Sequence, residues 1–281
     1  MSVIRSRSDR CPGVLRPWPA ADGLLVRLRL IGGRVSVTVL RRLAEVAEQY
    51  GDGRVYPTSR ANVQVRAFPG EGGELDPEAV AALEATGLLP ARTHERVRNI
   101  MVSPQTGVAG GVADLRGTAA RLDTLLCADP LLAGLPGRFL FVLDDGHGDL
   151  LGRSCDLGLV ALPGGQAQLR VGTGWGPVVP AEEAAARLAV LAHRFAELRG
   201  NGPAAPWHVA ELPGPLLDLV PPDPRLPAPA SVLPFGRVPG GRHVEVTSDG
   251  LGARQVAALT LAVPEVVVTP WRGVFIPEED R

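Results

Sequence analysis

The residues with the clearest chemical character lie in the stretch TSRANVQVR, residues 58–66. Its tail alternates: Arg60, Asn62, Gln64 and Arg66 share one parity, and small apolar residues occupy the other. Because successive side chains of a β-strand point to opposite faces, this pattern predicts a strand with one apolar and one polar face. Guanidinium and carboxamide groups in a row can hold a ligand that carries carboxylates or phosphates. A solvated outer face of a sheet is the alternative interpretation.

The basic residues restrict the chemistry that is open to this chain. All 29 are Arg, and the formal net charge is −1. Without Lys there is no P-loop lysine and no Schiff-base lysine, and the remaining cations are planar groups suited to carboxylates and phosphates. The balanced charge provides no basic field that would attract nucleic acid or an anionic membrane surface.

Length and composition indicate a globular protein. The chain has 281 residues, of which 45% are hydrophobic and 21% charged, enough for one large domain or a few smaller ones. No apolar run approaches the length of a membrane span. Residues 1–13 contain no apolar core of a signal peptide, so we expect a cytoplasmic protein.

The sequence offers no recognisable metal site. Cys11, Cys127 and Cys155 are isolated from one another, and none forms a Cys-x-x-Cys pair. No two histidines stand at ligand spacing; they are His94, His147, His193, His208 and His243. The stretch DDGHGD, residues 144–149, has the composition of an ion-binding loop but lacks the final Glu of a calcium loop. Its position between two expected strands favours a hairpin turn.

Both ends of the chain show the same order of elements. Alternation and helical periodicity predict a strand at 24–30, a helix at 36–50 and two strands within 54–68. Near the C-terminus, RHVEVTS, LGARQVAALTLA, EVVVTP and WRGVFIP follow the same order of strand, helix, strand and strand. We interpret this as two copies of one α+β unit, in which Arg272 repeats the position of Arg60. Chance similarity between β-strands is the alternative.

A different pattern separates the two copies. Strands are expected at VRNIMVS, GRFLFVLDD, LGLVAL and AQLRVGT. Helices are expected from residue 114 onward and over 181–199, where Glu182 and Glu183 suit the positive end of the helix dipole. Residues 203–234 are rich in Pro, which indicates a linker or an extended wrap.

Several of these stretches together resemble the nitrite and sulfite reductase superfamily, and within it the precorrin-3B synthases of aerobic cobalamin synthesis. The resemblance rests on CPGVLRPWPAADGLLVRLRL, TSRANVQVR, RNIMVSPQTG, LPGRFLFVLDDG and TPWRGVFIP. It implies an α+β fold in which two ferredoxin-like units are related by pseudo-two-fold symmetry, with one α/β tetrapyrrole-binding-type segment between them. The implied divisions are 10–70, the first ferredoxin-like half; 71–200, the α/β segment; 201–233, a Pro-rich linker; and 234–281, the second half.

The resemblance also implies a ligand and the residues that hold it. Sirohaem or a related carboxylate-rich tetrapyrrole would face the polar row and a second motif that contains Arg98 and Asn99. Guanidinium groups held on rigid strands suit a ligand that carries many carboxylates. The expected binding residues are Arg60, Asn62, Gln64, Arg66, Arg98, Asn99 and Arg272.

The cysteines depart from the family pattern. Family members carry two pairs of cysteines that bind a [4Fe–4S] cluster, and such a cluster needs four thiolates or close substitutes. The scattered cysteines of this sequence do not match that pattern, so no cluster is expected in this chain alone. Three hypotheses remain open: an oxidoreductase completed by a separate cysteine-bearing chain, a non-catalytic tetrapyrrole-binding or accessory protein, and a structural or regulatory remnant.

Overall fold

A computed structural model describes residues 9–259, 261 and 263–278 of the chain. The chain forms two compact units. We call the one made of Cys11–Arg96 and Leu233–Arg281 the duplicated unit. The α/β unit comprises Met1–Arg10 and Val97–Val232.

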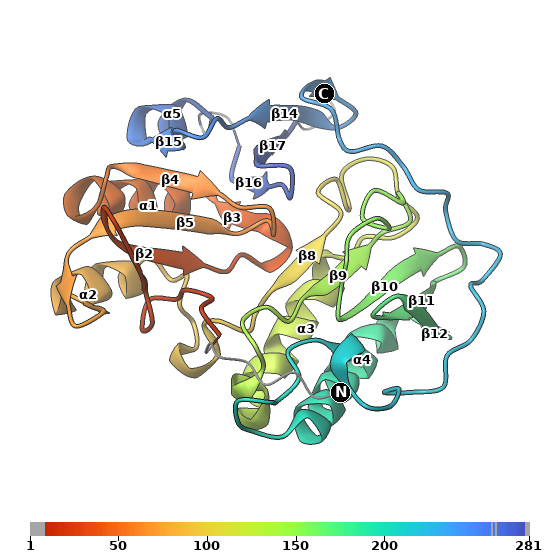
Figure 1. The fold of residues 1–281 in the computed structure, drawn as a ribbon. Helices are drawn as coiled ribbons and strands as arrows, with labels where there is room; N and C mark the ends of the chain where they lie inside the picture. Colours follow the sequence, from red (N-terminus) through yellow and green to blue (C-terminus); the bar gives the residue numbers. More distant parts are fainter. Residues whose placement is uncertain (1–8, 260, 262, 279–281) are drawn as a thin grey trace. The chain divides into compact units, whose positions relative to one another are not determined.

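The duplicated unit contains two five-stranded sheets with matching plans (Figure 1). The first sheet has the order β1-β2-β5-β4-β15, with bounds Trp18–Ala20, Gly23–Leu28, Val63–Phe68, Arg54–Pro57 and Leu251–Gly252. The second has the order β13-β14-β17-β16-β3, with bounds Gly236–Val238, Gly241–Glu245, Gly273–Pro277, Glu265–Val268 and Arg34–Ser36.

The two copies exchange a strand. Along the chain, β1-β2-β3-α1-β4-β5 is followed by β13-β14-β15-α5-β16-β17, with α1 at Val37–Tyr50 and α5 at Ala253–Leu259. In each copy the strand before the helix pairs with the other copy's sheet: β3 with β16, and β15 with β4. Consequently neither copy has a complete sheet of its own. The expected end of the second helix, at residues 260 and 262, lies outside the described residues, as does most of the N-terminal stretch 1–13.

Helix α1 forms where the sequence predicts it. The Ser36 hydroxyl caps its first turn by accepting from the Val39 amide, and Gly51 ends it. Its apolar face, which includes Leu40 and Leu43, joins one hydrophobic core with Val26, Val63 and Val65 of the first sheet and Val266 and Val274 of the second. The remaining elements are the hairpin β6–β7 (Gly70–Glu71 and Glu74–Leu75), α2 (Pro77–Ala85) and the 3-10 turns Ile31–Gly33 and Arg92–His94.

The α/β unit is built on one mixed sheet of order β12-β11-β10-β9-β8. Its strands are β8 (Ile100–Val102), β9 (Phe141–Asp144), β10 (Leu157–Leu162), β11 (Gln166–Val171) and β12 (Gly174–Pro180). Strands β8, β9 and β10 are parallel. Helices α3 (Arg116–Ala128) and α4 (Ala181–Arg199) pack against the sheet and each other, and two 3-10 turns span Pro130–Gly134 and Val209–Glu211.

One expectation for this unit is wrong, and one of the two alternatives for the Pro-rich segment is decided. Because β9 and β10 run parallel, the DDGHGD stretch begins a crossover, and the expected hairpin turn is wrong. The Pro-rich segment is an extended wrap along the sheet edge: the Val220 amide donates to the Trp175 carbonyl of β12 (2.8 Å), and the Asp223 amide donates to Oε1 of Gln168 (2.8 Å).

Candidate functional site

The polar row predicted from the sequence forms on the outward face of the first sheet. Strand β5 turns Val63 and Val65 into the core, which leaves Gln64 and Arg66 on the opposite face. Gln64 lies directly across from Arg27 of β2 and from Tyr56 of β4, so these side chains share that face. All are half-buried. We call the set of Arg27, Tyr56, Gln64 and Arg66 the outer row.

Asn62 does not belong to the outer row, contrary to the alternation. The strand begins only at Val63, after a tight turn in which Ala61 has a φ of 55°. Asn62 is therefore buried, and its Oδ1 accepts from the Leu30 amide at 2.9 Å. This hydrogen bond connects the segment after β2 to the turn. Removal of the carboxamide would leave the buried Leu30 amide without an acceptor.

Arg60 lies within that same turn and not on the strand. Its backbone amide and that of Asn62 approach the Thr58 hydroxyl, at 3.4 and 3.1 Å. The Arg60 side chain is half-buried. Of the predicted residues in the first copy, the structure therefore brings Gln64 and Arg66 onto one face, with Arg60 beyond the end of the strand.

Arg66 is only partly satisfied by its neighbours in the structure. One terminal nitrogen contacts the Asp22 carboxylate at 3.2 and 3.4 Å, and the guanidinium stands over the Tyr56 ring, 5.9 Å from its centroid. Its Nε is buried and has no hydrogen-bond partner among the described residues. A buried donor of this kind indicates a position where an acceptor is expected.

Tyr56 remains a hydrogen-bond donor at neutral pH. Burial raises its pKa to about 12, and the hydrogen bond to Asp52 acts in the same direction. The hydroxyl donates to Oδ2 of Asp52 at 2.6 Å. The ring thus holds a fixed position beside Arg66.

Arg29 is a buried cation that the sequence did not distinguish. Arg29 follows the polar alternation of β2 together with Arg27, yet it is only 3% exposed. Its NH1 donates to the carbonyls of Pro12 (2.5 Å) and Arg27 (2.8 Å). Burial, then the charge of Arg27, lowers its pKa to about 9, so it is still charged at neutral pH. No local pattern marks this residue, because Pro12 is distant in sequence.

A buried carboxylate completes the support of the same N-terminal segment. Glu95 accepts from the amides of Val14 (2.5 Å) and Leu15 (3.1 and 3.3 Å). Burial raises the pKa of this carboxyl, although the two amides and Arg29 oppose that effect. Arg29 and Glu95 therefore fix residues 12–15, and neither was predicted.

Arg98 and Asn99, predicted to bind ligand, lie in the α/β unit and have internal partners. Arg98 is 5% exposed and forms a two-pronged ion pair with Asp123 of α3, at 2.6 and 2.8 Å. Asn99 is buried, and its Nδ2 donates to the Gly137 carbonyl at 3.0 Å. These contacts secure the start of β8 to α3 and to the loop before β9.

Arg272 occupies a different turn position from the one predicted. In the first copy, the Thr58 amide donates to the Asn62 carbonyl and the Ala61 amide to the Thr58 carbonyl. In the second copy, the Thr269 amide donates to the Gly273 carbonyl and the Arg272 amide to the Thr269 carbonyl. Arg272, with a φ of 59°, is therefore the counterpart of Ala61, with 55°, and Trp271 is the counterpart of Arg60.

A group of acidic residues begins at the end of β9 and continues into the loop after it. Asp144 accepts from the amides of Gly146 and Gly148 at 2.9 Å, and Asp145 binds Nδ1 of His147 at 2.7 Å. The Ser103 hydroxyl, just after β8, donates to Asp149 at 2.7 Å. Burial raises the pKa of Asp149 to about 6, and the hydrogen bond to Asp145 raises that of His147. These bonds shape the crossover loop.

The cysteines do not suit a [4Fe–4S] cluster. Burial raises the pKa of Cys155 to about 11 and also raises that of Cys127, so both favour the protonated thiol. The sequence contains only these two and Cys11, fewer than the four thiolates that such a cluster uses. Among the described residues, no group of at least three His, Cys, Asp or Glu could hold a metal ion.

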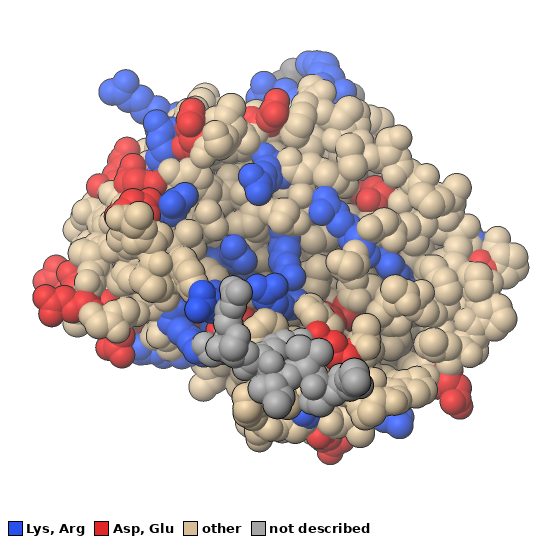
Figure 2. Space-filling view, viewed as in Figure 1, with Lys and Arg blue, Asp and Glu red and all other residues tan. Residues whose placement is uncertain are grey.

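The molecular surface carries charges of both signs. In the view of Figure 2, Arg side chains and acidic side chains both reach the surface, in keeping with the net charge of −1. Within the part of the chain that the structure describes, no helix is long and apolar enough to cross a membrane.

The first copy is similar to a half domain of known proteins. Residues 19–83 match the nitrite/sulfite reductase ferredoxin-like half domain. A precorrin-3B synthase of Sinorhizobium sp is 28% identical over 149 residues, which are 52% of this chain and 30% of that protein. A ferredoxin–nitrite reductase of Leptolyngbya laminosa is 31% identical over 129 residues, which are 43% of this chain and 25% of that protein. The matches thus span a third or less of these relatives.

A solved structure shares the fold. The Mycobacterium tuberculosis NirA protein superposes with a TM-score of 0.70 at 18% identity, covering 92% of this chain and 54% of that one. The predicted α+β fold with repeated ferredoxin-like halves is confirmed, and so is the resemblance to the nitrite and sulfite reductase superfamily.

Proposed function

We propose, from the premise that residues 19–83 form a nitrite/sulfite reductase ferredoxin-like half domain, that this chain binds a carboxylate-rich tetrapyrrole and acts on or through it in cobalamin biosynthesis. The reaction type is that of the precorrin-3B synthases and nitrite/sulfite reductases, which are oxidoreductases. The observation that carries the proposal is Arg66: a guanidinium held on strand β5, with its side chain 37% exposed on the face opposite the core.

The outer row suits the acid arms of such a ligand. Arg66, whose side chain is 37% exposed, offers the terminal end of its guanidinium to one carboxylate, and Gln64 offers an amide donor beside it. The guanidinium of Arg27 adds donors on the same face, while Tyr56, whose hydroxyl donates to Asp52, holds its ring beside Arg66. Because β5 is paired on both sides by β2 and β4, the donors stay in register before the ligand arrives.

Arg60 extends the outer row in this proposal, while other predicted residues act indirectly. Asn62 secures the turn that carries Arg60 through its bond to Leu30. Arg98 and Asn99 hold β8 in place in the α/β unit. When bound, a sirohaem-type group would supply the electron-accepting macrocycle; the residues named here bind and orient it and favour its anionic charge.

The iron–sulfur part of the family chemistry does not fit the cysteines of this sequence. We propose that its ligands, where the reaction uses a cluster, come from a separate chain. The second candidate is a non-catalytic tetrapyrrole-binding or accessory protein, which would use the outer row and need no iron–sulfur ligands at all.

A titration tests tetrapyrrole binding directly. Purified protein is titrated with carboxylate-rich uroporphyrin and, in parallel, with a porphyrin bearing few carboxylates, and the Soret band is followed. The proposal predicts saturable binding of uroporphyrin that weakens with salt, and at least about tenfold weaker binding of the other porphyrin. Equal binding of both would contradict an acid-arm clamp.

Expression together with the neighbouring genes separates the two candidates. Iron analysis and an absorption spectrum of the purified complex are the readouts. Iron and a sirohaem-like spectrum that co-purify with a cysteine-bearing chain support the oxidoreductase. Tetrapyrrole binding without iron in that experiment supports the accessory protein.

A further inference from the structure

The guanidinium of Arg66 has an acidic neighbour, Asp22, in the turn between β1 and β2. One terminal nitrogen of Arg66 lies 3.2 Å from Oδ2 and 3.4 Å from Oδ1 of Asp22. Both distances exceed the about 2.7–2.9 Å of a strong charge-assisted hydrogen bond. The Arg66 and Asp22 side chains are 37% and 42% exposed, and an ion pair that water reaches in this way contributes little free energy. The contact is therefore a weak one.

The backbone brings these two residues together. Ala20 pairs with Gly23 across a two-residue turn, so Asp22 stands at the tip of the β1–β2 hairpin. The pairing of β2 with β5 shifts register at Arg66 and Ala67, where Ala67 has a φ of 59°, and such bulges redirect side chains. Gly23 permits the turn to approach the bulge, because a Cβ there would lie 2.9 Å from the Ala67 backbone. The strand pairing thus places Asp22 beside Arg66.

The Asp22 side chain is held by Arg66 alone within the part of the chain that the structure describes. A second carboxylate of this region, Asp52, differs in this respect. Its Oδ2 accepts from the Tyr56 hydroxyl at 2.6 Å and its Oδ1 from the Arg54 amide at 3.0 Å. Asp52 is therefore fixed, whereas Asp22 can leave Arg66 without breaking another of these contacts.

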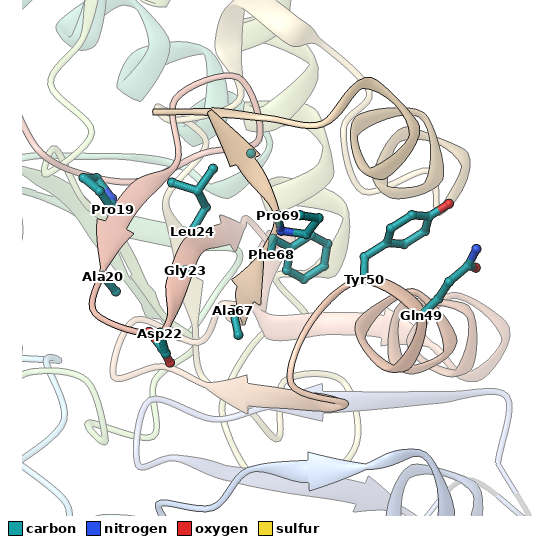
Figure 3. Close-up of a pocket in the computed structure, with 11 residues that line it drawn as sticks. Pro19, Ala20, Asp22, Gly23, Leu24, Gln49, Tyr50, Ala67, Phe68 and Pro69 are labelled. Atoms are coloured by element: carbon teal, nitrogen blue, oxygen red, sulfur yellow. The ribbon is translucent and has the colours of Figure 1, made fainter. Parts of the chain in front are cut away.

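An open groove of about 510 Å³ adjoins the same turn (Figure 3). Asp22, Gly23 and Ala67 are among the residues that line it. The Asp22 side chain thus borders open space into which it can move when another carboxylate takes its place. Its displacement then costs one exposed ion pair, which a carboxylate bound more closely to Arg66 replaces.

We propose that Asp22 is a displaceable counter-ion of Arg66, whose carboxylate occupies the position that an acid arm of the ligand takes. This inference rests on the proposed function, because it concerns the same outer row. It places one acid arm of the bound ligand at the β1–β2 turn. A simple anion gains little by exchanging places with Asp22, whereas a ligand with further arms also gains contacts to Arg27 and Gln64. Asp22 therefore selects for ligands with several carboxylates.

A double-mutant cycle tests this role, with uroporphyrin as the probe. The Soret titration compares the natural chain, Asp22→Asn, Arg66→Ala and the double variant at one ionic strength. Asp22→Asn removes the charge, keeps the shape and suits a turn. It should strengthen uroporphyrin binding about twofold to fivefold, the factor that corresponds to an exposed ion pair. In the Arg66→Ala background it should change the affinity by less than about 1.5-fold, since the guanidinium for which Asp22 competes is absent.

A charge-matched control separates this competition from a general effect of net charge. Glu45→Gln removes one negative charge from the exposed side of α1, the helix that packs on the opposite face of the same sheet. It should change the affinity by less than about 1.5-fold. Equal strengthening by Asp22→Asn and Glu45→Gln would overturn the inference, as would unchanged binding in Asp22→Asn.

The cycle also distinguishes failure of this inference from failure of the proposed function. If the natural chain binds uroporphyrin and Arg66→Ala weakens binding, the proposed function stands whatever Asp22→Asn does. An equal effect of Asp22→Asn with and without Arg66 would then overturn the counter-ion role alone. Absence of saturable binding in both the natural chain and Asp22→Asn would overturn the proposed function and this inference together.

Discussion

The outward faces of the two duplicated sheets differ although their scaffolds match. In the first sheet Gln64 lies between Arg27 and Tyr56. In the second, Phe275 lies between His243 and Val267, at the corresponding strand positions. The first trio is half-buried and polar, whereas the second is buried.

The second face is closed by the chain itself. Nδ1 of His243 lies 3.1 and 3.2 Å from the carbonyls of Leu233 and Pro234, and the Phe235 ring lies 4.5 Å from the imidazole. On the far side, Nε2 of His243 contacts the Thr269 hydroxyl at 2.9 Å. One copy therefore keeps a polar, half-buried face, while the other uses the same positions to anchor the Pro-rich segment. The two copies therefore share one backbone plan, but the outward faces of their sheets have different surroundings.

The largest effect on stability is expected at Gly273, where the outward face of the second sheet is most closely packed. Gly273 stands where the first copy has Asn62, and a Cβ there would lie 2.3 Å from Nε2 of His243 and 2.8 Å from Phe235. Gly273→Ala should lower the free energy of unfolding by about 2–3 kcal/mol through overpacking, as measured by urea denaturation. Gly214→Ala, where no atom lies within 4 Å, is the matched control and should change it by less than about 0.5 kcal/mol. Equal stability of both variants would refute the closed packing.

A smaller loss is expected at Asn62 in the first copy. Asn62→Ala removes the acceptor of the buried Leu30 amide and should cost about 1–2 kcal/mol of unfolding free energy. Gln64 lies two residues further along the chain, on the open face. Gln64→Ala should change the free energy of unfolding by less than about 0.5 kcal/mol. If Gln64→Ala were the more destabilising, the first face would not be the open one.

A third prediction concerns pH and His243. Burial lowers the pKa of this imidazole, although the two carbonyls oppose the effect. The unfolded state therefore binds a proton more readily, so this contribution to stability is complete above the ordinary pKa of about 6.5 and is lost as the pH falls below it. Between about pH 7.5 and about pH 5.5 the loss should be up to about 1 kcal/mol.

Comparison of pH dependence isolates this group. The unfolding free energy is measured across that range for the natural chain and for His243→Gln. Because His147 and His193 have raised pKa values and contribute with the opposite sign, the difference between the two proteins is the informative quantity. The variant should lose less stability on acidification, and an identical pH profile would show that His243 does not titrate as described.

The sequence predicts the local elements better than their pairing. Helix α1 was expected at 36–50 and spans Val37–Tyr50, since its cap, apolar spacing and final glycine are all local signals. The exchange of β3 and β15 between sheets depends on contacts between distant segments, which no window of sequence contains. The parallel pairing of β9 and β10 was missed for the same reason, because a short polar turn between strands suggests a hairpin.

The candidate site was predicted in part. Alternation correctly placed Gln64 and Arg66 opposite the core. It failed at Asn62 because the positive φ of Ala61 interrupts the strand geometry, and a turn of this kind is not visible in the polarity pattern. The burial of Arg29 depends on a segment remote in sequence. The likeness of TSRANVQ to TPWRGVF also gave the wrong register for Arg272, which the backbone hydrogen bonds align with Ala61.

The most direct test compares the same substitution in the two copies. Uroporphyrin affinity is measured by the Soret titration for Arg66→Ala and Arg272→Ala, which each remove one Arg that is partly or fully exposed. The account predicts that Arg66→Ala weakens binding about fivefold to tenfold, through loss of a charge-assisted contact, while Arg272→Ala leaves it unchanged. Equal losses in the two variants, or a loss only in Arg272→Ala, would contradict a binding face confined to the first sheet.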